Sequence, residues 1–419
     1  RVGREGLGES MTTQAQVRNQ AQAGFTLTEV MVATMMTTAL LAAGFGALTV
    51  SQKTTRVSGQ VGNTQATARN ALDMITADLK LAGFGMQGLT TPVGGCHING
   101  TPSALVPVDS NPAGIDFGPD SISMVVPMTN SITAVGALWQ VFVPPAGTIG
   151  GPKVPITNIP MPANATTGMG TALPGGFLSL PGNVVSLGGV AGSIIQVANV
   201  GGLTINPAIQ DPTAFGTGTQ VYLVQCITYQ VIPPPDALNI CQGASPCLVR
   251  GAVPAALVLP GTPPNCNQVN ANCVPIMDGV EDFQLEYACD GCSPLINSGN
   301  PDGQIDDLNG NNIFDTPDFV TNRNWFGTAA PFGASMTPAK IRMVQVTIVA
   351  RQTQLDQGMG EGISTNVSNN NTITNVSDHN HATGVFALGD NATPAQQQAY
   401  LQFRRRVQAR TVELRNLRS

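Results

Sequence analysis

The eight cysteines are the residues with the most readable chemistry in this sequence of 419 residues. Only Cys289 and Cys292 have the C-x-x-C spacing, and a zinc site would need a second such pair or nearby histidines. An even number of cysteines predicts disulfides formed in an oxidising compartment. Short loops favour the local pairs Cys241–Cys247 and Cys266–Cys273, while the remaining pairing and a redox-active Cys289–Cys292 stay open. The disulfide candidates are Cys96, Cys226, Cys241, Cys247, Cys266, Cys273, Cys289 and Cys292.

A second set of candidate ligands lies in a segment rich in Asp and Asn. Oxygen-bearing side chains stand at loop positions 1, 3, 5, 9 and 12, with a main-chain carbonyl at position 7, which is the spacing of an EF-hand-type calcium loop. Asn312 replaces the usual Gly at position 6, and asparagine tolerates the left-handed conformation needed there. The sequence predicts a Ca²⁺ site, and a solvated turn is the alternative. The predicted ligands are Asp307, Asn309, Asn311, the carbonyl of Ile313, Asp315 and Asp318, with Asp302 and Asp306 as further ligands or simple neighbours.

Other reactive residue types have simpler interpretations. His379 and His381 could bind a transition metal, but in an Asn-rich stretch we expect them to be solvated. We expect Cys96 and His97 to have a structural role, and the run Arg404–Arg406 to flank an edge strand. The sequence contains no G-x-S-x-G, Walker loop, dinucleotide fingerprint or H-E-x-x-H motif, so we expect a protein that is not an enzyme.

The composition limits the fold and the partners. Charged residues make up only 11% of the chain, the net charge is −6, and Gly and Pro contribute 47 and 31 residues. So many helix breakers exclude a coiled coil or helical repeat, and an acidic, charge-poor chain argues against nucleic-acid binding. This composition favours short strands and turns outside the cell.

The segment from Phe25 to Val50 is apolar, contains no proline and carries one charge, Glu29. It is long enough to span a bilayer as a helix, with a cleaved secretory signal or a buried core helix as the alternatives. A lone carboxylate at membrane depth costs on the order of a few kcal/mol, so Glu29 needs a partner. Cleavage after Gly24 would free an α-amino group on Phe25 that could pair with the Glu29 of an adjoining subunit.

The stretch Gly24-Phe-Thr-Leu-Thr-Glu29-Val-Met-Val-Ala resembles the class III signal of type IV prepilins. The resemblance implies a leader over residues 1–24, with Met11 as an alternative start, and a prepilin peptidase that cleaves between Gly24 and Phe25 and methylates the new terminus. It also implies that Glu29 is the carboxylate used in filament assembly.

The remaining sequence predicts an α+β fold. Apolar residues recur at helical spacing across residues 51–85, so the transmembrane or filament-core helix over residues 25–50 continues as an amphipathic helix. Residues 86–419 alternate short apolar runs with Gly, Pro and Asn, which predicts an antiparallel β-rich head. We expect long loops at 144–192, an Asp/Asn-rich loop at 302–318 and an Asn-rich insertion at 364–381. Strands are expected at 122–127, 138–143, 193–200, 220–232, 248–253, 256–259, 280–287, 341–351 and 407–414.

Several segments are similar to the PilW-type minor pilins, which are related to the J-class pseudopilins of type II secretion. These segments are Arg69–Phe84, Gly118–Val125, Val280–Tyr287 and Phe403–Asn416. The resemblance implies a minor pilin of the type IV pilus that helps to initiate assembly and can display an adhesive head. It would be a single-pass inner-membrane protein with a periplasmic head before it enters the filament at the cell surface. Its partners would be the prepilin peptidase, other minor and major pilins and the inner-membrane assembly platform. The alternatives are a type II secretion pseudopilin and a membrane-anchored periplasmic binding protein or enzyme.

Overall fold

The computed structural model describes fifteen stretches of the chain, and the predicted leader and the strand expected at 138–143 lie outside them. These stretches are residues 25–84, 92–109, 118–133, 156–160, 184–187, 190–198, 202–209, 220–241, 245–259, 262–293, 296–321, 337–352, 375–376, 379–380 and 405–417. The chain divides into two compact units, residues 1–59 and 60–419. One helix, α1 (Leu27–Leu81), contributes to both units.

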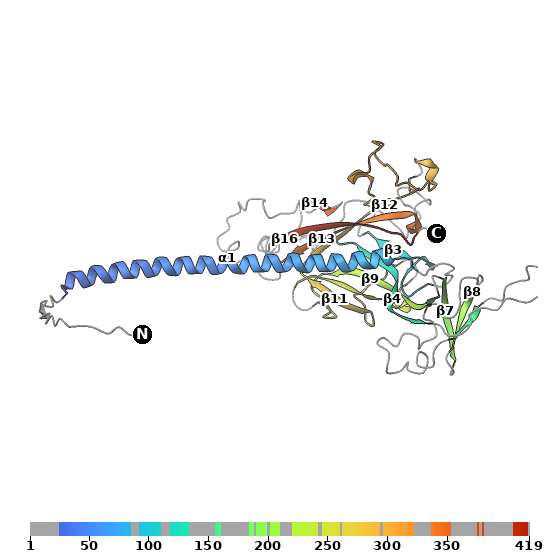
Figure 1. Ribbon diagram of the computed structural model, residues 1–419, viewed down its shortest axis with the longest axis horizontal. Coiled ribbons are helices and arrows are strands. Elements are labelled where there is room, and N and C mark those ends of the chain that lie inside the picture. The colour runs from blue at the N-terminus through green and yellow to red at the C-terminus, as the bar shows by residue number, and fades with distance from the viewer. Residues whose placement is uncertain are drawn as a thin grey trace, which may run out of the picture. The chain divides into compact units, whose positions relative to one another are not determined.

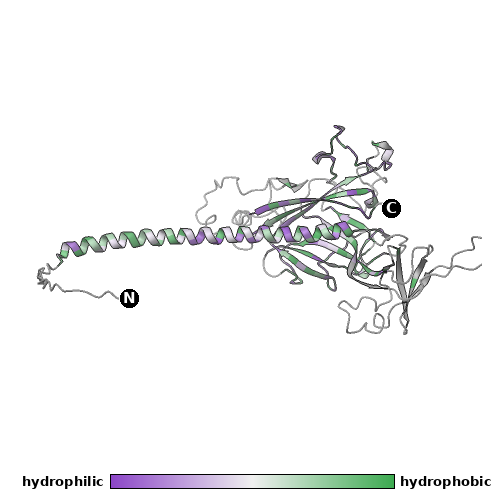
Figure 2. Ribbon diagram, viewed as in Figure 1, coloured by the Kyte–Doolittle hydropathy of each residue, from purple (hydrophilic) through white to green (hydrophobic). Residues whose placement is uncertain are grey.

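In the first unit, α1 is exposed and apolar. Every residue from Phe25 to Arg56 is exposed, including large side chains such as Leu40 and Phe45 at 73% and 66%. Among the described helices, α1 alone is long and apolar enough to cross a membrane (Figure 2). A water-exposed helix of a soluble domain seldom carries apolar residues on every face, so this apolar helix indicates membrane anchoring.

In the second unit, α1 forms part of the core. One face of the helix is buried at a spacing of three and four residues, through Ala68, Ala71, Leu72, Ile75, Leu79 and, just beyond the last turn, Ala82. The helix ends at Leu81, and Gly83 then takes a positive φ of 80°. A Cβ atom on Gly83 would lie 2.7 Å from Leu417 Cδ2, so glycine lets the C-terminal segment pack against the helix end.

Antiparallel pairing joins all the described strands. The larger sheet has nine strands, with β11-β10-β9-β6-β7-β8-β5 in order, and β4 pairs with both β9 and β3. Its strands are β3 (Leu105–Val108), β4 (Ser121–Thr133), β5 (Ile156–Pro160), β6 (Val184–Leu187), β7 (Val190–Ala198), β8 (Gly202–Ile209), β9 (Gln220–Ile232), β10 (Cys247–Ala252) and β11 (Asn272–Asp278). The hairpins β1 (His97–Ile98) with β2 (Thr101–Pro102) and β14 (Asn375–Val376) with β15 (His379–Asn380) are separate.

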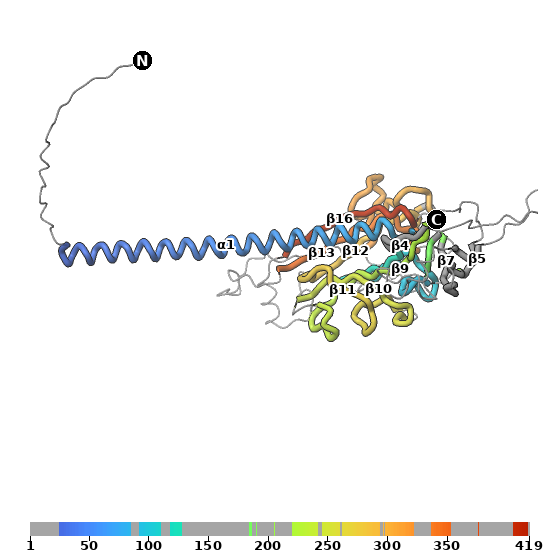
Figure 3. The backbone as a smooth tube through the Cα atoms, turned by 60° about the horizontal axis from the view of Figure 1, so that its bottom comes forward, coloured from blue at the N-terminus to red at the C-terminus, as the bar shows by residue number. Residues whose placement is uncertain are grey.

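A second sheet has the order β12 (Val280–Cys289), β13 (Ile341–Arg351) and β16 (Arg405–Glu413). The buried face of α1 and apolar residues of both sheets form one core cluster. The two sheets are also hydrogen-bonded at Asp120, whose N–H donates to the carbonyl of Phe283 (2.8 Å) and whose carboxylate accepts from the N–H of Leu285 (2.9 Å). β16 lies alongside α1 in both views, and Arg410 on this strand pairs with Asp73 of the helix (Figures 1 and 3).

These elements confirm the predicted α+β fold class. The strands expected at 220–232 and 341–351 form with those bounds. The strand expected at 256–259 is wrong, because Ala255–Leu257 forms a turn of 3-10 helix after Pro254, which lacks the N–H that a ladder needs. The long loops expected at 144–192 contain β5, β6 and the start of β7. Within the Asn-rich insertion, the described residues form the short strands β14 and β15.

Candidate functional site

The first turn of α1 places Glu29 in a capping box. The N–H and the hydroxyl of Thr26 both donate to Glu29 Oε2 (2.9 Å each), and the N–H of Glu29 donates to Thr26 Oγ1 (3.3 Å). The carboxylate is thus held beside the unpaired N–H groups of the helix start, where the helix dipole favours an anion. Phe25 precedes this turn and is 86% exposed, while Gly24 lies outside the described residues.

Threonine hydroxyls along the apolar part of α1 are hydrogen-bonded within the helix itself. Thr37 and Thr38 donate to the carbonyls four residues earlier at 2.7 and 2.6 Å, and Thr49 donates to the carbonyl of Gly46 at 2.8 Å. A hydroxyl without a partner is costly in an apolar environment. Because these bonds need no water, this part of the helix is compatible with lipid or a filament core.

In the head, Asp307 organises the start of the Asp-rich loop. Its Oδ1 accepts from the N–H groups of Gly310 (2.7 Å) and Asn311 (3.2 Å), and its Oδ2 accepts from the N–H of Asn312 (2.6 Å). The bond from Asn312 is the main reason that the pKa of Asp307 lies below its ordinary value. Asn312 has a φ of 61°, the left-handed conformation expected at position 6.

The other predicted calcium ligands fold around the same loop. The amide groups of Asn309 and Asn311 donate to the two oxygens of Asp315 at 2.8 and 2.7 Å. Asp318 is buried, and its carboxylate accepts from the N–H groups of Leu308 (2.8 Å) and Asp315 (2.9 Å). Among the described residues, no group of three or more His, Cys, Asp or Glu side chains is arranged to hold a metal ion. A calcium ion in this loop would therefore also need the side-chain amide oxygens of Asn309 and Asn311 and the main-chain carbonyl oxygen of Ile313 as ligands.

All eight cysteines form disulfides, as the sequence predicts. The local pairs Cys241–Cys247 and Cys266–Cys273 are both present, and the pairs that the sequence left open are Cys96–Cys226 and Cys289–Cys292. Cys96–Cys226 joins segments 130 residues apart, which no local spacing could reveal.

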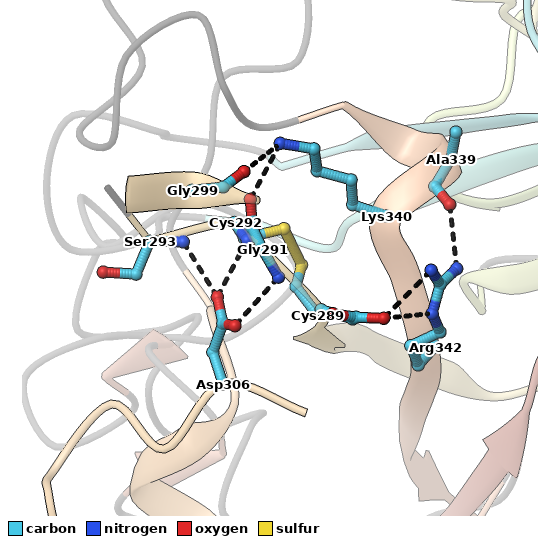
Figure 4. Close-up of a disulfide and its surroundings, with 10 residues drawn as sticks. Cys289, Gly291, Cys292, Ser293, Gly299, Asp306, Ala339, Lys340 and Arg342 are labelled. Atoms are coloured by element: carbon cyan, nitrogen blue, oxygen red, sulfur yellow. Dashed lines mark hydrogen bonds and ion pairs between the residues drawn. A yellow bond between two sulfur atoms is a disulfide. The ribbon is translucent and has the colours of Figure 1, made fainter. Parts of the chain in front are cut away.

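Asp306 has a role that the sequence analysis left undecided. Its carboxylate accepts three backbone hydrogen bonds, from Gly291, Cys292 and Ser293, at 2.8 to 2.9 Å (Figure 4). It therefore binds the turn closed by the Cys289–Cys292 disulfide and is not an open ligand. The sequence does show that the Asp306 carboxylate comes 14 residues after the Cys-x-x-Cys segment. This spacing alone does not show that the backbone N–H groups of that segment are its hydrogen-bond partners.

A cluster that sequence reasoning missed joins α1 to the larger sheet. Asp78 Oδ2 accepts from the hydroxyl of Tyr229 (2.6 Å) and from Nε of Arg250 (2.8 Å), and Arg250 also lies over the Tyr229 ring. Burial, and then the Asp78 charge, raise the pKa of Tyr229 above its ordinary value, because both oppose ionisation of the phenol.

The remaining candidates that the structure describes lie at structural positions. His97 is buried, and its Nδ1 accepts from the N–H of Gly100 (3.3 Å). His379 lies in β15, and His381 and Arg404 lie outside the described residues. Arg405 and Arg406 lie at the start of β16, an edge strand of its sheet, as the sequence predicts. The side chain of Arg405 is nevertheless buried and paired with the buried Glu281.

An apolar N-terminal helix whose second part enters the core of an antiparallel β head is the arrangement that the resemblance to pilins implies. The model of the family PilW, described as Type IV Pilus-assembly protein W, matches residues 244–416. This match confirms the resemblance to PilW-type pilins, and the part of the head from 244 to 416 carries it.

Among solved structures, a type IV-like pilin from Thermus thermophilus matches with 12% sequence identity over 87% of this chain and 100% of that chain, at a TM-score of 0.26. A similarity at this level carries no argument, so the fold class rests on the helix and sheets described above. No curated protein matches the chain.

Proposed function

We propose that the chain is a minor pilin of the type IV pilus. Prepilin peptidase cleaves between Gly24 and Phe25 and methylates the new amino terminus. The protein then stays in the inner membrane with its head in the periplasm until the assembly platform moves it into a filament with other minor and major pilins. The PilW match and the exposed apolar helix support this role, which is structural and not catalytic.

The observation that carries the proposal is the position of Glu29 in an apolar helix. Both bonds from Thr26 go to Oε2, and no described residue bonds Oε1. Oε1 is therefore free to pair with the α-amino group of a neighbouring subunit. In an apolar filament core each of these charges would be strongly destabilised alone, so the pair favours assembly.

The role in the filament follows from the same chemistry. A minor pilin that supplies such a pair can help to start the assembly of other pilins, and its head is then carried to the cell surface, where it can act in adhesion. If the chain is instead a type II secretion pseudopilin, its deletion should block secretion and leave pili intact.

The processing site is tested with Gly24→Ala in the full chain. We expect unprocessed precursor on a gel, and mass spectrometry of the native protein should find methylated Phe25 at the amino terminus. A native terminus at any other residue contradicts the proposal.

The assembly role is tested with Glu29→Gln, which keeps the shape of the side chain and removes its charge. Cleavage should continue while incorporation into filaments falls by at least tenfold. Thr34→Val is the matched control, since the Thr34 hydroxyl bonds only within the helix, to the carbonyl of Met31. Equal filament content in both variants would refute the pairing.

We also propose that the Asp-rich loop binds Ca²⁺ through Asp307, Asn309, Asn311, the carbonyl of Ile313, Asp315 and Asp318. The side chains of Asn309, Asn311 and Asp315 lie within hydrogen-bonding distance of one another and Asn312 is left-handed, which supports the site. A bound ion would replace the two amide N–H bonds to Asp315 and take the amide oxygens as ligands. Calcium should raise the Tm of the full chain in detergent, and Asp307→Ala combined with Asp315→Ala should abolish this rise. Asp73→Ala, on the exposed side of α1, should leave the rise unchanged. A Tm that does not respond to calcium or to chelators would refute the site.

A further inference from the structure

The turn from Cys289 to Cys292 holds the beginning of the Asp-rich loop. Besides the three N–H groups that this turn directs at Asp306, the N–H of Asp306 donates to the carbonyl of Cys289 (2.8 Å). Asp306 and both cysteines are buried. Four hydrogen bonds thus join one residue to a turn that the disulfide closes into a small ring.

The turn is itself fixed to the sheet from its other side. Lys340 Nζ donates to the carbonyls of Gly291 and Gly299, both at 2.8 Å, and Arg342 pairs with Asp290 at 3.1 Å (Figure 4). Asp290 also accepts from the N–H of Asp302 at 2.8 Å. The turn therefore links β13 to the segment that leads into the loop.

The conformation of the turn depends on its closure. Gly291 has a φ of 80°, and a Cβ atom there would lie 2.6 Å from the backbone N of Pro301. Three consecutive N–H groups converge on one carboxylate only while the chain is tightly bent, and the Cys289–Cys292 bond enforces this bend. An open chain could rotate these N–H groups away, which would leave Asp306 buried without enough donors.

Beyond Asp306, the described attachments of the loop to the head lie near its two ends, where Leu308 packs against the core cluster and Val320 is part of it. Its first ligand position, Asp307, follows Asp306 directly, and residues 309–314 are exposed. At the far end, Val320 forms a bridge with Tyr287. The hydrogen bonds of Asp307 lie within the loop itself, so the anchored turn determines where the loop starts.

We propose that the Cys289–Cys292 disulfide and Asp306 form a redox-dependent anchor, so that the Asp-rich loop keeps its folded shape only while this disulfide is closed. Closure joins the two Sγ atoms and transfers two electrons and two protons to a disulfide oxidant, which becomes a dithiol. Under the proposed function, the loop and its calcium affinity mature only after the head has reached the oxidising periplasm.

The anchor is tested by hydrogen exchange of residues 307–318 in the full chain in detergent, with a chelator present. Cys289→Ser with Cys292→Ser should speed the exchange of this segment about tenfold or more, the change expected when bonds to a buried carboxylate are lost. The matched control, Cys266→Ser with Cys273→Ser, also opens a short ring and should leave this segment unchanged. Equal exchange in the native chain and the Cys289/Cys292 variant, or equal acceleration in both double variants, would overturn the anchor.

Asp306→Ala keeps the disulfide and provides a second test, which applies even if the serine variant does not fold. It should reproduce the faster exchange of residues 307–318, and Asp306→Asn, which retains one acceptor oxygen, should give a smaller change. Native exchange in Asp306→Ala would refute the anchor. Added calcium should slow exchange in the native chain and have a weaker effect in the variants. If calcium protects no form, the calcium proposal fails, while the comparison in chelator still decides the anchor.

Discussion

The contact between α1 and the larger sheet gives a quantitative prediction through Asp78→Ala. Tyr229 is fully buried, and its hydroxyl donates to Asp78 at 2.6 Å, so the substitution leaves a buried donor without its acceptor. That loss costs about 1–3 kcal/mol. Arg250 is 31% exposed, so solvent screening limits the ion pair to about 0–1 kcal/mol. Alanine has a higher helix propensity than aspartate, which stabilises the variant by about 0.5 kcal/mol. The net decrease in the free energy of unfolding is therefore about 1–3 kcal/mol.

The assay is urea unfolding of the full chain in detergent, followed by circular dichroism at constant pH. Asp73→Ala is the matched control because Asp73 lies on the same helix and forms an exposed ion pair with Arg410. The control should change the free energy of unfolding by less than about 0.5 kcal/mol. If Asp78→Ala and Asp73→Ala give the same unfolding free energy, the buried Tyr229 hydroxyl does not depend on Asp78 and the reasoning is wrong.

The contact also predicts a dependence on alkaline pH. Burial and the Asp78 charge raise the pKa of Tyr229 in the folded state above its ordinary value of 10.0. A raised pKa contributes stability that is present below the ordinary value and is lost as the pH rises from there toward the folded value. The native chain should therefore lose stability above about pH 10, and more steeply than Tyr229→Phe. Equal slopes would contradict a buried phenol.

Three further substitutions test the head. Gly251→Ala would bring a Cβ atom into collision with the backbone oxygen of Asn272 in β11, so it should displace that strand and speed proteolysis there. Gly118→Ala has open space around it and should do neither. Glu281→Gln leaves Arg405 buried beside a neutral partner and should lower the unfolding free energy by about 3–5 kcal/mol in urea. Hydrogen bonds lower the pKa of Asp307, so the ionised carboxylate should keep the loop ordered at any pH above the ordinary pKa of 3.8. This order should be lost as the pH falls through the lowered pKa, which hydrogen exchange of the loop would detect. Hydrogen exchange of the loop in Asp307→Asn should show no such pH dependence.

Periodicity predicted the elements whose environment is uniform along their length. β9 and β13 are largely buried on long apolar runs rich in Val and Ile, and the expected ranges match the observed ones. The helix was readable for the same reason, since no proline interrupts it and one face is buried at helical spacing in the head. The prediction succeeded where a single pattern persisted for several turns or strand residues.

The edge strand β11 and the distant contacts were beyond this reasoning. β11 is exposed on most of both faces, contains Pro275, and so has no alternation to detect. The partners of Asp306 and Asp78 come from segments that meet only in the folded head. Glu281 could be recognised as a charge in an expected strand, but nothing local identified Arg405, which is 124 residues away, as its partner.

The two parts of α1 imply different consequences for truncation. Residues 25–56 contribute no buried side chain, whereas Ala68 to Ala82 supply one face of the core, and the division between the compact units falls at Gly59. A chain that begins at residue 53 should therefore form the same four disulfides and keep the effect of Asp78→Ala on unfolding. A chain that begins after Leu72 should lose both, because half of the buried helix face is removed. If the shorter chain still forms all the disulfides, the helix is an attachment to an independently folded head and not part of its core.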